Sequence, residues 1–176
     1  MLPTATQTVS ASLASLVRDY TTYNLWANCQ LVKWLKTKPA ELFEQEVPSS
    51  FRSLKATLLH IWDLERCWFA HVKQQPVTSF RQEGFDGTLE EILEGILAES
   101  EAIDDYASFI SEEQLQEGCF FSMPYAGDHM LPAFEIILHA MNDSTYHRGQ
   151  LVTIGRALGL IDAPITDYMY YLLRVK

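Results

Sequence analysis

One aspartate and one histidine in this sequence stand where hydrophobic side chains are expected. On a helix that turns about 100° per residue, Asp143 and His147 fall about 40° and 80° from His139. The same arc also holds Ile136, Ala140, Leu151, Ile154 and Leu158. Because burying an unpaired carboxylate costs several kcal/mol, Asp143 needs a cationic partner or a metal ion.

His60 repeats this anomaly on an earlier helical segment. Its neighbours on the same helical face are Ile61, Leu64 and Trp68. The acidic Asp63 is expected to point elsewhere. Helical bundles build metal sites from side chains on the inner faces of facing helices. The sequence therefore predicts a divalent metal site formed by His60, Asp143 and His147, with open positions for water or substrate.

Two structural interpretations of the same residues stay open. A single histidine on an apolar face, such as His60, is more often a hydrogen-bonded core residue than a metal ligand. Asp143 and His147 are four residues apart, so they can form a buried ion pair without a metal. Spacing alone does not decide between these interpretations and a metal site.

The other histidines and polar neighbours are assigned lesser roles. We expect His139, Asn142 and Tyr146 to support helix packing or to orient a ligand. His71 lies too far along its helix to join the predicted site. His129 falls in a loop and carries no signal. No side chain has the pattern of a dedicated general base, so no catalytic residue is assigned.

Four segments with helical periodicity must position these residues. They cover approximately residues 9–36, 51–73, 88–110 and 132–158. Ser49 and Ser50 are N-cap candidates for the second helix, and Pro132 suits the first position of the fourth. Thr88 and Glu91 match a capping box at the start of the third helix. Four long amphipathic helices predict an all-α fold, a four-helix bundle.

Shorter elements are expected between and after these helices. Ser111 can start a further helical turn, and the aromatic, turn-rich segment 118–130 is typical of a short hairpin. The tail from Tyr168 is expected to pack back as a short C-terminal helix. No repeat or linker interrupts the chain, so residues 1–176 are expected to form a single domain.

Composition limits the kinds of binding partner and the cellular compartment that we expect for this protein. The 176 residues carry a net charge of -10 and no local basic patch, so nucleic acid is not an expected partner. Cys29, Cys67 and Cys119 form neither a disulfide framework nor a thiolate zinc site, which suits a reducing compartment. No signal peptide and no apolar run of about 18 residues is visible. We therefore expect a cytoplasmic protein that does not bind membranes.

Three segments of the chain match a known family. The most specific is Asn142–Gln150, which contains the run Tyr-His-Arg-Gly-Gln and follows Leu138–Met141. Tyr23–Asn28 and Leu59–Trp68 give weaker support. In order and spacing, these segments closely resemble the DinB/YfiT-like family of metal-dependent bundle proteins, over nearly the whole chain.

The resemblance implies an antiparallel four-helix bundle with an unusual crossover and a divalent metal held between helices. Family members usually supply three histidines; His60 and His147 match two of them, and Asp143 replaces the middle one. A carboxylate oxygen is a harder ligand, which shifts preference from nickel or copper towards zinc, manganese or iron. The metal is thus expected to be zinc, nickel, manganese or iron, unless the substitution leaves the site weak or vacant.

The resemblance also implies two classes of function. Characterised relatives include thiol-dependent S-transferases and a thiol-dependent isomerase, so the leading expectation is a metal-dependent enzyme. It would join a small thiol to a small electrophile, as a low-molecular-weight-thiol S-transferase, or hydrolyse a small substrate. The alternative is a non-catalytic metal- or ligand-binding bundle.

A homodimer is the expected assembly. Family members often pair, and the first helix presents Tyr20, Trp26 and Trp34 on more than one face. Such aromatic surface would suit a partner subunit.

Overall fold

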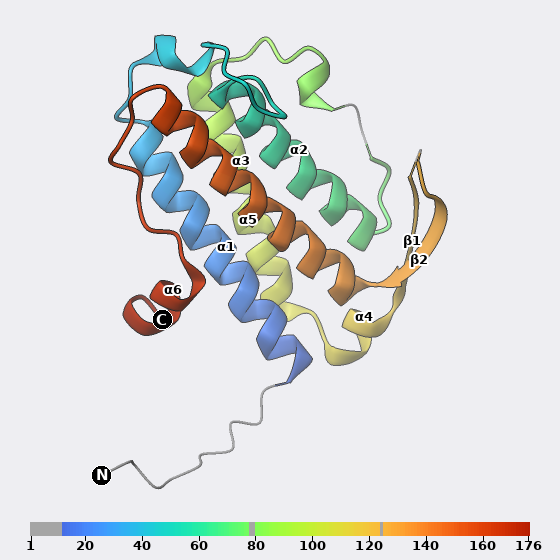
Figure 1. Cartoon of the computed structure of the whole chain (residues 1–176). Helices are drawn as coiled ribbons and strands as arrows, with labels where there is room; N and C mark the ends of the chain where they lie inside the picture. Colours follow the sequence, from blue (N-terminus) through green and yellow to red (C-terminus); the bar gives the residue numbers. More distant parts are fainter. Residues whose placement is uncertain (1–11, 78–79, 124) are drawn as a thin grey trace, which may run out of the picture.

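The structure, a computed structural model, describes residues 12–77, 80–123 and 125–176. These residues form a mostly helical fold with one small sheet (Figure 1). The elements are α1 (Leu13–Leu35), η1 (Ala40–Phe43), α2 (Leu54–Val72), η2 (Arg81–Glu83), α3 (Leu89–Phe109), α4 (Glu112–Gln116), β1 (Gly118–Met123), β2 (Gly127–Pro132), α5 (Ala133–Ala157) and α6 (Tyr168–Arg174). The expected start of the first helix at residue 9 lies outside the described residues.

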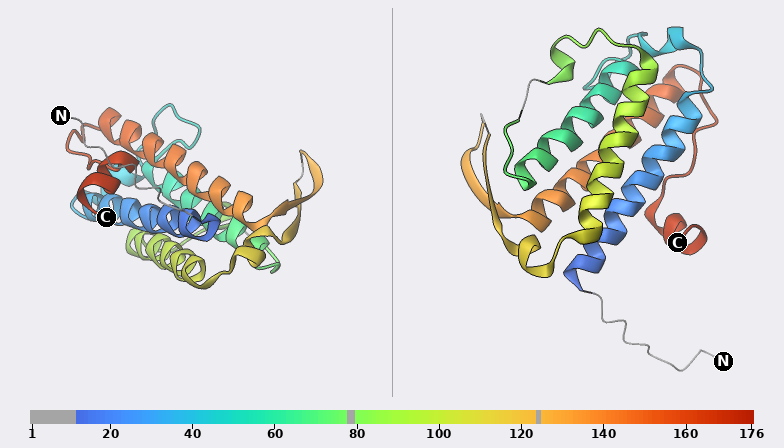
Figure 2. Two further views of the ribbon diagram at one scale, coloured as in Figure 1. Left: turned by 90° about the horizontal axis from the view of Figure 1, so that it is seen from below. Right: turned by 180° about the vertical axis from the view of Figure 1, so that it is seen from behind.

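The four long helices lie side by side around a shared core (Figures 1 and 2). Helix α2 packs on α5 and α3, and α1 packs on the same two helices from the other side. Helices α1 and α5 run in one direction, and α2 and α3 run in the other (Figure 1). Helices α2 and α3 are thus parallel, and η2, which precedes α3, packs on α2, with Gln82 against the Ala56 carbonyl near the start of that helix.

The helix starts agree with the sequence in part. Thr88 and Glu91 form the predicted capping box, with the Glu91 amide donating to Thr88 Oγ1 at 3.2 Å. The prediction for α2 was wrong: its N-cap is Ser53, whose hydroxyl accepts from the Ala56 amide, rather than Ser49 or Ser50. A backbone hydrogen bond from the residue 47 amide to the residue 52 carbonyl, 2.8 Å long, keeps the preceding loop outside the helix.

Pro132 ends β2 and caps α5 instead of occupying the first helical position. Its ψ of 147° is extended, and the following residue, Ala133, is the first of the helix. The amide of Ala133 donates to the Glu117 carbonyl at 3.0 Å, which ties the start of α5 to the end of α4. The start of α5 is therefore fixed relative to α4 and to the hairpin between them.

The short elements follow the predictions. Strands β1 and β2 form an antiparallel hairpin in which Phe121 pairs with His129, so the fold is not purely α-helical. Ser111 caps the short helix α4. Helix α6 is the expected C-terminal helix. None of the helices within the described ranges is long and apolar enough to cross a membrane.

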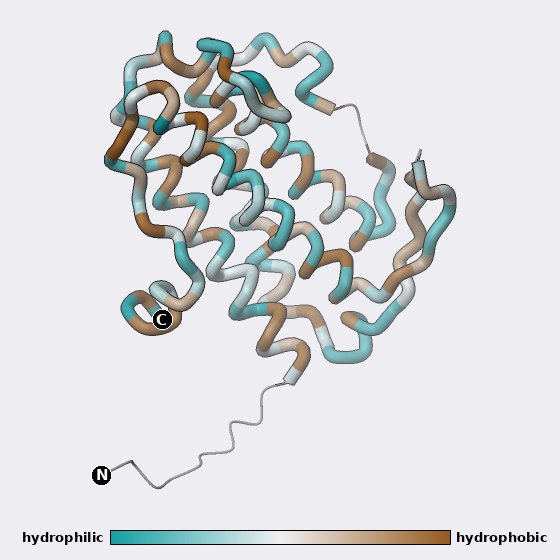
Figure 3. Tube along the Cα trace, viewed as in Figure 1, coloured by the Kyte–Doolittle hydropathy of each residue, from teal (hydrophilic) through white to brown (hydrophobic). Residues whose placement is uncertain are grey.

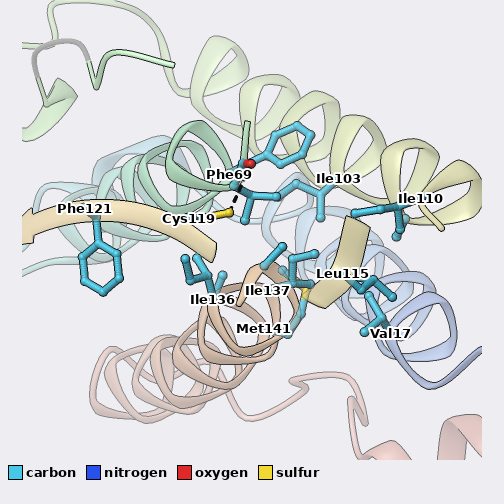
Figure 4. Packing of buried hydrophobic residues seen from close by; sticks show 14 of the residues in the cluster. Val17, Phe69, Ile103, Ile110, Leu115, Cys119, Phe121, Ile136, Ile137 and Met141 are labelled. Carbon is cyan, nitrogen blue, oxygen red and sulfur yellow. Dashed lines mark hydrogen bonds between the residues drawn. The ribbon is translucent and has the colours of Figure 1, made fainter. Parts of the chain in front are cut away.

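Hydrophobic side chains fill the space between the helices, and hydrophobic and hydrophilic residues alternate along each helix (Figure 3). One core cluster surrounds the buried Cys119 of β1, whose thiol donates to the Val72 carbonyl at 3.6 Å (Figure 4). Phe69, Ile136 and Ile137 belong to the same cluster. The hairpin is thereby anchored on α2 and α5, the two helices that carry the predicted metal ligands.

Helix α6 covers the aromatic residues that were expected to face a partner subunit. Tyr20 packs edge-on against Tyr168, with ring centroids 5.5 Å apart, and Trp26 packs against Tyr171 at 5.3 Å. Trp34 is buried in the core. Residues far along the chain therefore cover part of the aromatic surface inferred for α1, and Tyr20 and Trp26 stay partly exposed. The homodimer itself stays a prediction.

Candidate metal centre

Helices α2 and α5 bring His60 and His147 face to face. Their Nε2 atoms are 3.0 Å apart, and the two rings are nearly perpendicular, at 78°. His147 is buried and His60 partly buried. The apolar faces on which sequence periodicity placed these histidines are the faces through which the two helices pack.

Asp143 lies one helical turn before His147 and contacts it. Its Oδ1 is 3.3 Å from His147 Nε2, and its Oδ2 is 3.9 Å from His139 Nε2. The hydrogen bond with His147, reinforced by the neighbouring histidines, lowers the pKa of the Asp143 carboxyl. The three residues predicted from the sequence are thus adjacent, with His147 in contact with both of the others.

Gln150 fixes the orientation of His147. Its Oε1 is 2.9 Å from His147 Nδ1. Because an amide oxygen only accepts hydrogen bonds, this contact places a proton on Nδ1 and, in a neutral ring, a lone pair on Nε2. The hydrogen bond from Nε2 to Asp143 Oδ1 needs a second proton on the ring or the other tautomer, so an ion at Nε2 would replace that hydrogen bond. The sequence analysis did not single out Gln150. Its spacing of three residues from His147 on the same helix was the available signal.

His60 is held neutral. Burial, followed by the proximity of His147, lowers the pKa of His60 from 6.5 to about 4. Phe51 stacks on the His60 ring at 4.0 Å and meets the His147 ring edge-on at 5.4 Å. An apolar ring over both imidazoles disfavours a charged histidine and shields the pair from water on one side.

The supporting residues named from the sequence divide into two groups. His139 contacts Asp143, and the Tyr146 ring packs edge-on against His147 with centroids 5.0 Å apart. Asn142 is exposed. His71 meets Cys67, with Nε2 and Sγ 3.8 Å apart, and does not contact the histidine pair.

A pocket of about 740 Å³ opens beside the site. Its walls come from α2, the segment around η2, the hairpin and α5, and His60 and Asp143 line it. Asp63 also lines the pocket, contrary to the expectation that it points elsewhere. Its side chain is buried, and Arg66, Arg81 and the Gln82 amide contact its oxygens and compensate that burial.

A second buried polar cluster lies next to the site and joins side chains of all four long helices. Glu65 of α2 accepts hydrogen bonds from Asn24 (2.8 Å), Asn28 (2.9 Å), Ser100 (2.6 Å) and Ser144 (2.8 Å). All of these side chains are buried. We call this group, together with Arg148, the Glu65 network.

Arg148 is joined to Glu65 through two carboxamides. Its Nη1 donates to the side-chain oxygens of Asn24 and Asn28, whose amide nitrogens donate to Glu65. Burial lowers the pKa of Arg148 and the carboxylate of Glu65 opposes that shift. The sequence analysis did not find this network, because its members lie on three other helices as well as on α2.

Within the described residues, no three histidine, cysteine, aspartate or glutamate side chains form a ready metal-binding group. The fold and the pocket together define a mostly helical protein with a histidine- and carboxylate-lined pocket between two of its long helices.

The model of the DinB family matches residues 8–173. Protein DinB of Bacillus subtilis (strain 168) is 30% identical over 162 residues, which cover 88% of this chain and 92% of that protein. The chain belongs to the DinB family.

Two solved structures resemble the fold. A DinB-like protein from Bacillus cereus ATCC 10987 superposes with a TM-score of 0.65 at 19% identity, over 82% of this chain and 91% of that one. A DinB-like protein from Bacillus subtilis gives a TM-score of 0.56 at 13% identity, over 88% and 96% of the two chains. At these identities the likeness concerns the fold alone.

Proposed function

We propose that His60, Asp143 and His147 bind a divalent metal ion and that the protein is a metal-dependent enzyme. The observation that carries the proposal is the position of His147 Nε2, which lies 3.0 Å from His60 Nε2 and 3.3 Å from Asp143 Oδ1. Tetrahedral ligands about 2.0–2.2 Å from one ion lie about 3.3–3.6 Å from each other. The Nε2–Oδ1 distance reaches that range, and the two Nε2 atoms would have to separate by a few tenths of an ångström to admit an ion.

The chemistry of the donors supports the same proposal. Metal ligation requires neutral imidazoles, and the low pKa of His60 meets that requirement, while Gln150 orients the His147 ring. Two histidines and one carboxylate leave coordination positions open and suit zinc, iron or manganese, with nickel also possible. When bound, such an ion lowers the pKa of a thiol or of water.

For the reaction, we propose a low-molecular-weight-thiol S-transferase or a small-substrate hydrolase. The support is the family resemblance of the Asn142–Gln150 segment together with the pocket beside His60 and Asp143. The chain itself would orient the substrate in this pocket, exclude water on the side covered by Phe51, and counter the charge of the ion with Asp143. No side chain is assigned as a catalytic acid or base.

A non-catalytic binding bundle is the second candidate, and a specific observation favours it. The three side chains already satisfy one another: His60 contacts His147, which contacts Asp143 and Gln150. A buried polar network of this kind needs no ion to be stable.

Elemental analysis of protein purified without an affinity tag tests the metal site. We expect about one divalent ion per chain in the wild type and almost none in His60→Ala, Asp143→Ala and His147→Ala. His129→Ala is the matched control, because His129 lies on the exposed hairpin, where it contacts the Ala126 carbonyl and the Phe121 ring and none of the three proposed ligands. Metal content that is unchanged in all three site variants would contradict the assignment.

A thiol panel separates the two candidate functions. Each small thiol is incubated with a small electrophile, with chelator and then with one added ion. The enzyme is expected to lose turnover with the chelator and to regain it with one preferred ion. The binding bundle is expected to show no metal-dependent thiol consumption and to keep its ligand affinity in Asp143→Asn.

Three further assignments belong to the same proposal. The packing of α1, α2, α3 and α5 supports an antiparallel four-helix bundle with a long crossover. The cytoplasmic location and the homodimer are further parts of this proposal. Light scattering that gives a mass near the 20.1 kDa of one chain at micromolar concentration would contradict the dimer.

A further inference from the structure

A second pair of metal-ligating side chains lies further along α2 than His60. Cys67 and His71 are one helical turn apart, and their Sγ and Nε2 atoms are 3.8 Å from each other. Both side chains are partly buried, and both line the pocket of about 740 Å³. An ion that enters this pocket can therefore reach a thiol and an imidazole that lie close together.

The separation of the two donor atoms suits an ion between them. A sulfur about 2.3 Å and a nitrogen about 2.0–2.1 Å from one ion are about 3.5–3.6 Å apart at a tetrahedral angle and about 3.7–3.8 Å apart at a trigonal angle. The observed 3.8 Å matches the trigonal value without movement of either side chain. The contact that an ion would replace is weak, because a thiol is a poor hydrogen-bond donor and acceptor.

The ring of His71 is held by two aromatic side chains. Its centroid is 5.6 Å from the Trp68 ring and 5.6 Å from the Phe121 ring. Trp68 in turn packs edge-on against Phe121, with centroids 5.5 Å apart. These contacts restrict rotation of the imidazole before an ion binds, which lowers the entropic cost of binding.

The pair offers two protein donors rather than three or four. Asp63, one turn before Cys67, also lines the pocket. Its oxygens are already in contact with Arg66, Arg81 and the Gln82 amide, so it is not a free donor. Two donors, one of them a soft thiolate sulfur, suit a soft cation of low coordination number such as Cu(I). A monovalent ion also forms a neutral complex with one thiolate, which costs less to hold among aromatic rings than a charged complex.

We propose that Cys67 and His71 form a second metal site, which binds a soft monovalent cation. The thiol loses its proton to the solvent when the ion binds, so the ion is held by a thiolate and a neutral imidazole. The ion keeps a coordination position for a further donor in the pocket, such as a small thiol. The site shares no ligand with the cluster of His60, Asp143 and His147, so it does not depend on the proposed function.

Competition for Cu(I) against a chromophoric chelator tests this site, with reduced, full-length protein under anaerobic conditions. We expect Cys67→Ser to weaken Cu(I) binding at least about 100-fold and His71→Ala at least about tenfold, because each removes a ligand. Cys29→Ser is the matched control, because Cys29 is a partly buried free cysteine on α1 and is not one of the described residues that line the pocket. Wild-type affinity in Cys67→Ser, or an equal loss in Cys29→Ser, would overturn the proposal.

Two further measurements separate this site from the first one. His147→Ala should keep the Cu(I) affinity of the wild type, and Cys67→Ser should keep the divalent ion found by elemental analysis. X-ray absorption at the copper edge should show sulfur and nitrogen bound directly to the ion in the wild-type protein, a result that does not depend on how a variant folds. Copper without a sulfur ligand, or a loss of Cu(I) in His147→Ala as large as in Cys67→Ser, would overturn the separate site. Because the two assays follow different ions, either proposal can fail while the other succeeds.

Discussion

Helices α2 and α5 carry two buried polar clusters that differ in what surrounds them. The Glu65 network is enclosed by helices, and its carboxylate receives four hydrogen bonds from neutral donors. The cluster of His60, Asp143 and His147 borders a pocket of about 740 Å³. In the first cluster every donor to the carboxylate comes from the protein, whereas in the second the donor atoms face one another beside an open space.

This difference separates a structural role from a binding role. Buried charges are tolerated when hydrogen bonds and opposite charges satisfy them, and they then hold helices in one arrangement. A cluster at the wall of a pocket can exchange its internal contacts for contacts with an ion or ligand. We therefore expect changes in the Glu65 network to affect mainly stability, and changes in the histidine cluster to affect mainly binding.

The largest effect is expected for Glu65→Ala. The substitution leaves Arg148 buried without its counter-charge, which should lower the free energy of unfolding by about 3–5 kcal/mol. Chemical denaturation measures the loss, with Glu101→Ala on the exposed face of α3 as the control. A loss no greater than that of the control would remove the distinction between the two clusters.

Gln150→Ala should act on metal binding rather than on stability. Without the hydrogen bond to Nδ1, His147 is free to rotate and to change tautomer, so the affinity for zinc should fall about 10- to 100-fold. Competition with a chromophoric chelator measures the affinity. Thr153→Ala, an exposed position on the same helix, should leave it unchanged. A normal affinity in Gln150→Ala would show that this hydrogen bond does not orient the ligand.

Ser144→Ala should have a smaller effect, again on stability. Ser144 follows Asp143 directly on α5, yet its hydroxyl donates to Glu65. Loss of one of four donors to a buried carboxylate should cost about 1–2 kcal/mol, measured by denaturation. Metal affinity should stay within error of the wild type. If the metal affinity falls while stability is retained, Ser144 belongs to the binding cluster instead.

The smallest effect concerns acid stability of the metal-free protein. The unfolded chain protonates His60 near pH 6.5, and the folded chain does so only near pH 4. Between these values the unfolded state binds more protons, so stability should fall as the pH falls through this window and level off below it. Solvent screening keeps the effect small because His60 is partly exposed.

The contribution of His60 protonation to stability is isolated by comparing the wild type with His60→Gln. Urea midpoints of both proteins are measured from pH 7 to pH 4. The difference between the two proteins should shrink or change sign as the pH falls. Parallel curves over the whole window would show that His60 keeps an ordinary pKa in the folded state.

Local sequence patterns determined where the helices lie along the chain and which face of each helix points inward. The capping box of Thr88 and Glu91, the turn-rich segment before α5 and the apolar periodicity were sufficient because each depends on neighbours a few residues apart. Periodicity also placed His60 and His147 on inner faces, and the structure brings these two side chains into contact.

Only the tertiary structure decided which polar side chains meet. Arg148 contacts Asn24 across 124 positions of sequence, and Glu65 contacts Ser144 across 79. No local pattern encodes such a pairing, since a polar residue on an inner face looks the same whatever helix lies opposite. For the same reason the sequence of α1 did not show that α6 packs against Trp26 and Tyr20. The sequence determined which residues face inward, and the packing of helices distant along the chain decided what each of them contacts.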